Sequence, residues 1–125
     1  MDVEGMPAAS LVGLSWGGVI AQVVAGLNPE RIRKLVLVDS GYDSSEKGIA
    51  QLRKIRIPTL VVWDEEDSVI PVAGAHFLAS TMPNAQVRIL KPNEREPDAN
   101  PNERHWSQVS HSTIWNLVVS EFLAQ

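Results

Sequence analysis

The fold is decided by residues 9–27, which read ASLVGLSWGGVIAQVVAGL. The first six residues form a short apolar run typical of a buried strand. Residues 17–27 repeat their apolar positions with the period of a helix. Ser15 lies between the two patterns with a small residue two positions away on either side. The stretch therefore predicts a strand, a sharp turn at Ser15 and an amphipathic helix.

Residues 13–17 match the pattern Gly-x-Ser-x-Gly, in which a tight strand-to-helix turn exposes a nucleophilic serine hydroxyl. Three fixed positions of this kind would occur by chance in only about 4 of 100 chains of this length. The strand before the motif and the helix after it strengthen the match. The competing interpretation is an ordinary glycine-rich turn in which Ser15 only caps the helix.

Three further apolar runs, each rich in Val, Leu or Ile, predict strands at residues 34–38, 59–63 and 86–90. Two of them are apolar without alternation, as in a parallel sheet that is covered on both faces. Helical patterns lie between and after the runs, at residues 45–55, 72–81 and 113–123. We expect an α/β fold with about four parallel strands and flanking helices.

Composition limits the size and the partners of the protein. A chain of 125 residues with 44% apolar content suits one domain, residues 1–125. A net charge of −4 without a basic run disfavours nucleic acid and anionic membranes as partners. An acidic start and the absence of an apolar stretch near 20 residues predict a soluble cytoplasmic protein. With no cysteine, disulfides and thiolate metal sites are excluded.

Residues 91–104 are the irregular part of the chain, with three prolines and no large apolar side chain. This composition predicts a mobile surface loop. The loop leads directly to His105, so the alternative is a lid over a site.

A serine hydroxyl needs a base to remove its proton, and the base needs an acceptor that orients it. Acidic candidates follow the predicted strands at the edge of the sheet where Ser15 is expected: Asp39, Asp64, Glu65, Glu66 and Asp67. His105 is the favoured base because it also lies at this edge and completes the chain order Ser, Asp, His. His111 is an alternative, although the start of the last helix is a simpler position for it. His76 falls within a predicted helix.

Four stretches resemble the second half of serine-dependent α/β-hydrolase-fold enzymes: residues 12–22, 29–39, 57–63 and 105–108. That branch includes carboxylesterases, enol-lactonases, proline iminopeptidases and carbon–carbon bond hydrolases. The resemblance implies that Ser15 is the nucleophile, Asp67 the acid and His105 the base. It also implies that the Trp16 N–H helps to bind the oxyanion, and that no cofactor is needed.

The chain departs from that pattern in three ways. Only residues 1–8 precede the first predicted strand, where the family has about four strands and a helix that supply a second oxyanion donor. The usual cap is reduced to residues 41–54, and Arg104 replaces the glycine that precedes the catalytic histidine. We therefore expect a half-size hydrolase of small esters or lactones. The alternatives are a noncatalytic binding domain and a fragment of a larger hydrolase.

The first predicted strand, residues 9–14, has no charge or proline to protect it if it lies at a sheet edge. Right-handed crossovers would put three helices on one face of the sheet and leave the last helix alone on the other. Pairing of two copies at this edge would cover the exposed strand. We therefore predict a homodimer that forms through this edge or through the uncovered face of the sheet, with a small-molecule ester as substrate.

Overall fold

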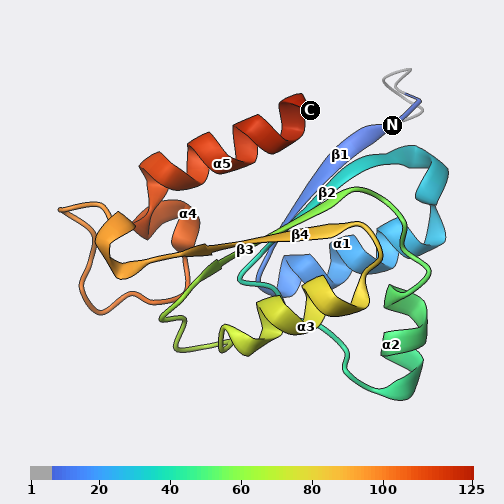
Figure 1. Ribbon diagram of the computed structural model, residues 1–125, viewed down its shortest axis with the longest axis horizontal. Helices are drawn as coiled ribbons and strands as arrows, with labels where there is room; N and C mark the ends of the chain where they lie inside the picture. Colours follow the sequence, from blue (N-terminus) through green and yellow to red (C-terminus); the bar gives the residue numbers. More distant parts are fainter. Residues whose placement is uncertain (1–6) are drawn as a thin grey trace.

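The computed structural model describes residues 7–125, and its centre is a sheet of four parallel strands (Figure 1). The strands stand in the order of the sequence, and they are β1 (Ala9–Leu14), β2 (Ile32–Val38), β3 (Thr59–Asp64) and β4 (Ala85–Leu90). The predicted α/β fold with four parallel strands is confirmed.

Helices connect the strands and follow the last one: α1 (Trp16–Leu27), α2 (Glu46–Leu52), α3 (Ala73–Thr81), α4 (Ser107–Ser110) and α5 (Ser112–Ala124). Two short 3₁₀ turns, η1 (Pro29–Arg31) and η2 (Pro92–Glu94), begin at prolines. The helix predicted at residues 45–55 ends earlier, because Lys54 N–H bonds to the Gln51 carbonyl in a tighter turn. The sequence analysis missed α4, which is a single turn.

The two faces of the sheet are covered unequally. Helices α1, α2 and α3 lie on one face, and α5 lies on the other with the short α4 beside its start (Figure 1). The core under the three helices includes Ala21, Ala25, Leu35, Leu37, Leu52, Val61, Trp63, Ala75 and Leu78. The core under α5 is smaller and consists of Val36, Val38, Leu60, Val62, Leu90, Val119 and Phe122. Consecutive right-handed crossovers produce this arrangement.

Strand β1 stands at one end of the sheet, and α5 does not cover it fully. Val12 pairs in register with Val36, which is wholly buried, yet the Val12 side chain is 43% exposed. Part of the sheet along β1 is therefore left uncovered.

The proline-rich segment, residues 91–104, is held by specific contacts. Glu94 forms an ion pair with Arg88 of β4 at 2.6 Å, and Glu96 N–H donates to the Ser110 carbonyl at 2.7 Å. The Arg95 guanidinium lies 3.6 Å from the buried Asp64 carboxylate. These contacts tie a segment that the sequence analysis expected to be mobile to β4 and to the start of the last helix.

Candidate active site

Ser15 stands at the turn from β1 into α1, as the sequence analysis predicted, and its backbone is in a left-handed conformation with φ of 54°. Such a conformation costs a non-glycine residue about 1–3 kcal/mol. Three backbone hydrogen bonds hold it: Ser15 N–H donates to Val38 at 2.9 Å, while the Ser15 carbonyl accepts from Gly18 and Gly41 at 3.0 Å. The turn therefore depends on the segment that follows β2.

Close approach of neighbouring atoms explains why positions 13 and 18 are glycine, but it does not explain Gly17 of the motif. A Cβ atom on Gly13 would lie 2.7 Å from the Gly17 carbonyl oxygen. A Cβ on Gly18 would lie 1.9 Å from the Ser40 hydroxyl, whereas a Cβ on Gly17 would meet open space. The tight position after the serine is thus Gly18, and the Gly-x-Ser-x-Gly pattern alone does not identify it.

The structure brings Ser15, His105 and Asp67 into one chain of hydrogen bonds. The Ser15 hydroxyl lies 2.6 Å from His105 Nε2, and His105 Nδ1 lies 2.8 Å from Asp67 Oδ2. The other Asp67 oxygen accepts from the backbone N–H groups of Val69 and Ile70, each at 2.8 Å. With Nδ1–H donating to the carboxylate, Nε2 is free to accept the serine proton.

His105 is positioned by the backbone on either side of it. The Arg104 carbonyl accepts from Ser68 N–H at 3.0 Å, which joins the His105 segment to the loop that carries Asp67. The Glu103 carboxylate accepts from the N–H groups of His105 and Trp106. Although Arg104 replaces the glycine of the family pattern, these contacts place the histidine next to Ser15.

The two other histidines lie in different surroundings. His111 is fully buried, and its two ring nitrogens contact the Ser110 hydroxyl at 2.9 Å and the Lys91 carbonyl at 3.0 Å. His76 is exposed on α3. Neither histidine joins the chain of hydrogen bonds at Ser15.

The acidic neighbours of Asp67 make their own contacts. The buried Asp64 carboxylate lies near Arg95, Glu65 pairs with Lys91 at 3.0 Å, and Glu66 lies 3.7 Å from Arg104. Asp67 is thus the acid of the loop after β3 that contacts His105.

Asp39 is a further buried acid at this edge of the sheet, directly after β2. Burial raises the pKa of its carboxyl from the usual 3.8 to about 7, against the lowering effect of a hydrogen bond from Ser107. The nearby Asp67 charge raises this pKa further. The sequence analysis considered Asp39 only as a rival for Asp67, because its contact with Ser107 joins residues 68 positions apart.

Known proteins resemble the chain in sequence and in fold. It is 28% identical over 98 residues to a 2-hydroxy-6-oxo-6-phenylhexa-2,4-dienoate hydrolase of Burkholderia cepacia, covering 78% of this chain and 31% of that protein. It is 34% identical over 76 residues to the monoacylglycerol lipase ABHD6 of Mus musculus, covering 56% of this chain and 23% of that protein. No protein-family profile matches the sequence.

The fold comparison covers nearly the whole chain. A predicted CIB-like hydrolase from Thermoplasma acidophilum matches 98% of it with a TM-score of 0.81 at 20% identity. A meta-cleavage product hydrolase from Pseudomonas fluorescens IP01 matches 99% of it with a TM-score of 0.80 at 16% identity. The chain has the α/β-hydrolase fold. It spans about a third or less of the curated relatives' length, and 53% and 67% of those two solved chains.

In this α/β-hydrolase fold, two of the four tryptophans flank the site. Trp16 is 73% exposed next to Ser15, and Trp106 is 45% exposed with its ring centroid 5.0 Å from that of His105. Trp63 is instead fully buried in the core. Trp16 also opens α1, where the first backbone N–H groups of a helix have no acceptor within the helix.

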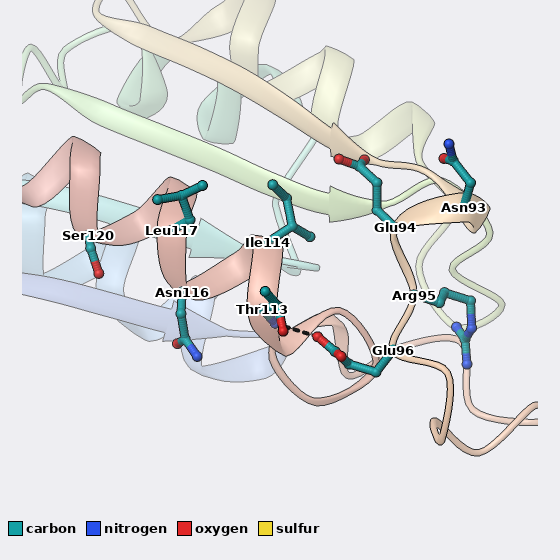
Figure 2. Close-up of a pocket in the computed structure, with 9 residues that line it drawn as sticks. All are labelled: Asn93, Glu94, Arg95, Glu96, Thr113, Ile114, Asn116, Leu117 and Ser120. Carbon is teal, nitrogen blue, oxygen red and sulfur yellow. Dashed lines mark hydrogen bonds between the residues drawn. The ribbon is translucent and has the colours of Figure 1, made fainter.

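A separate hollow of about 700 Å³ lies between the proline-rich segment and α5 (Figure 2). In Figure 2 the Glu96 side chain points across to Thr113, whose N–H it accepts. Ser15, His105 and Asp67 do not line this hollow.

Residues 7–125 contain no group of three or more His, Cys, Asp or Glu side chains that could hold a metal ion. No helix in the same part of the α/β-hydrolase fold is long and apolar enough to span a bilayer.

Proposed function

We propose that the chain is a serine hydrolase that cleaves small carboxylic esters or lactones through an acyl-enzyme on Ser15. The observation that carries the proposal is the continuous hydrogen-bonded chain from Ser15 through His105 to Asp67. A serine, an imidazole and a carboxylate in this order form the arrangement that activates a serine hydroxyl. The strained backbone at Ser15 adds support, because such strain is concentrated at functional sites.

In the proposed reaction, Ser15 Oγ attacks the substrate carbonyl while His105 Nε2 takes the hydroxyl proton. The Asp67 carboxylate stabilises the imidazolium that forms and holds its ring in place. His105 then gives the proton to the departing alcohol oxygen, leaving an acyl group on Ser15. Water attacks this ester with His105 again acting as base, which releases the acid and restores the serine.

The negative oxygen of the tetrahedral intermediate needs hydrogen-bond donors. The Trp16 N–H follows Ser15 directly and belongs to the free first turn of α1, so we assign it as one donor. Removing a single donor of this kind typically lowers kcat by about 10²–10³-fold. With one assigned donor, the proposed activity is weaker than that of a site with two.

The substrate class rests on the surroundings of the site. The exposed rings of Trp16 and Trp106 stand beside the nucleophile and the base, where they offer apolar contact to an acyl or alkyl chain. A hydrolase named for monoacylglycerol, an ester with an apolar acyl chain, is among the sequence relatives. We infer that esters with an apolar acyl group suit this site better than charged ones.

Hydrolysis of p-nitrophenyl butyrate and labelling by a fluorophosphonate test the proposal. Ser15→Ala should abolish labelling and lower kcat/KM at least about 10³-fold, because the nucleophile is lost. Ser10→Ala is the matched control, since Ser10 is an exposed serine of the same strand. Absence of activity in the unaltered chain, or equal activity in Ser15→Ala, would instead favour a noncatalytic domain or a fragment of a larger hydrolase.

A further inference from the structure

Asp39 lies where the segments that carry the three site residues meet. Its N–H donates to the Val62 carbonyl of β3 at 3.0 Å, and its Oδ1 accepts from Asp64 N–H at 2.9 Å. Two residues later, Gly41 N–H donates to the Ser15 carbonyl. Asp39 is therefore fixed to the strand that leads to Asp67 and belongs to the segment that supports the serine turn.

The second carboxylate oxygen of Asp39 holds the segment that carries His105. Oδ2 accepts from both donors of Ser107, the hydroxyl at 2.5 Å and the backbone N–H at 3.2 Å. Ser107 is fully buried, opens the short helix α4 and follows His105 by two residues. Any shift of Ser107 would thus be transmitted to His105 through a single intervening residue.

A buried carboxylate is costly unless hydrogen bonds compensate for its lost hydration. Asp39 is 1% exposed, and its backbone has a left-handed φ of 44°, a second cost for a non-glycine residue. Both costs fall on the residue that joins β3, the serine turn and α4. The hydrogen bond from the Ser107 hydroxyl is also the shortest of the three that Asp39 accepts.

We propose that Asp39 is a positioning residue that keeps His105 in line with Ser15 by holding Ser107 at the carboxyl ends of β2 and β3. It does not touch the substrate or the transferred proton, and Asp67 remains the acid that contacts His105. The inference rests on the proposed hydrolase function for its kinetic part only. Its structural part concerns the geometry of the His105–Asp67 hydrogen bond.

The ionised form of Asp39 is the one that accepts both Ser107 donors. Protonation of Oδ2 removes one of its acceptor positions and weakens the hold on Ser107. The ionisable groups around it are Asp64, which ends β3, Asp67 in the loop after β3, and His105, which precedes Ser107. As the pH falls through about 7, Asp39 gains its proton and its hold on Ser107 weakens. Protonation of Asp39 should therefore contribute to a fall of kcat below about pH 7.

Three variants test the role of Asp39. Asp39→Asn keeps the size of the side chain. With its amide oxygen accepting from Asp64 N–H, its NH2 group faces Ser107 and cannot accept from it. Ser107→Ala removes only the hydroxyl donor. Ser110→Ala is the matched control, because Ser110 is a buried serine of the same helix that bonds to His111 instead.

The first measurement is the low-field NMR signal of the His105 Nδ1 proton in the hydrogen bond to Asp67, which needs no substrate. We expect it to shift or broaden in Asp39→Asn and Ser107→Ala and to stay unchanged in Ser110→Ala. The second is kcat for p-nitrophenyl butyrate against pH. In both test variants kcat should fall by about 10–100-fold with KM within two-fold, since small misplacements cost this much. The fall of kcat below about pH 7 should be smaller in Asp39→Asn, because this variant lacks the Asp39 carboxyl that gains the proton.

The outcomes separate the two proposals. An unaltered His105 signal and normal kcat in Ser107→Ala would overturn the positioning role, even where Asp39→Asn fails to fold. A His105 signal that depends on Ser107 in a chain without esterase activity would support the positioning role and overturn the proposed hydrolase function. If the wild-type chain is active and the test variants keep its kcat and pH profile, the hydrolase function is supported and the positioning role of Asp39 is overturned.

Discussion

At the scale of single residues, His105 and His111 show how position decides the part that a histidine plays. His105 is partnered by Ser15 and Asp67, two side chains suited to proton transfer. His111 is partnered by the Ser110 hydroxyl and the Lys91 carbonyl, which fix the start of α5 against the proline-rich segment. The contacts of His105 support its proposed role as the base, and those of His111 support a structural role.

Alanine substitutions should separate these two parts. His105→Ala should abolish fluorophosphonate labelling of the folded protein, because the proposed base is lost. His111→Ala should cost about 2–3 kcal/mol of unfolding free energy, because it leaves a cavity and an unpaired buried carbonyl. Urea unfolding and labelling of the folded fraction measure both effects. If labelling is lost in a folded His111→Ala variant and retained in His105→Ala, the base is His111 and not His105.

Asp39 should also affect how the free energy of unfolding depends on pH. The folded-state pKa near 7 exceeds the unfolded value near 3.8, so the folded protein binds the extra proton between these pH values. The Asp39 contribution to the unfolding free energy therefore falls as the pH rises from about 4 to 7, by as much as about 4 kcal/mol. Urea unfolding at several pH values should show a shallower decline, or a rise, in Asp39→Asn. Equal slopes in both proteins would contradict the raised pKa.

At the scale of elements, α5 depends on charged residues from elsewhere in the chain. It has no acidic residue in its first turn and no basic residue in its last. Glu96 accepts from Thr113 N–H and the Ser112 hydroxyl at one end, and Lys34 donates to the carbonyls of Phe122 and Leu123 at the other. The negative charge of Glu96 at the start of the helix and the positive charge of Lys34 at its end both interact favourably with the helix dipole.

Removing the Glu96 charge tests this support. The hydrogen bonds from Thr113 lower the pKa of Glu96 in the folded state, so its stabilising effect is present above the unfolded pKa and lost as the pH falls through the folded one. Glu96→Gln should lower the thermal midpoint at pH 7, with a difference that disappears in acid. Asp98→Asn, on the same segment, is the control and should have no such effect. A constant difference at all pH values would exclude the charge as the cause.

The sequence predicted the elements themselves better than the contacts between them. Apolar runs located all four strands, because a covered parallel sheet leaves a local pattern. The chain order of Ser15, Asp67 and His105 likewise follows from where strands end. The contacts of Lys34 with α5 and of Asp39 with Ser107 join residues far apart, and no local pattern encodes them. The need for glycine at position 18 was missed for a similar reason, because it arises from the close approach of the Ser40 side chain, which is distant in sequence.

At the scale of the whole molecule, the two edges of the sheet differ in character. Strand β4 carries Arg88, whose ion pair with Glu94 covers part of that edge. Strand β1 carries no charge, and its Val12 is 43% exposed. On the adjoining helix α1, an apolar stripe also faces outward, formed by Trp16, Ile20, Val23 and Leu27. Exposed apolar surface of this extent marks an interaction site, and an open strand without charges favours pairing with another chain.

We predict that two copies associate through the β1 edge. A two-fold axis beside β1 would pair the two strands in antiparallel fashion, and an uncharged edge does not repel its own copy. Association should therefore change little with salt. Sedimentation velocity should show dimers whose fraction rises with protein concentration. Val12→Lys should prevent dimer formation by burying a charge in the new contact, whereas Val87→Lys, at a similarly exposed position on β4, should not. A monomer at every concentration, or equal effects of both substitutions, would show that β1 is not the contact.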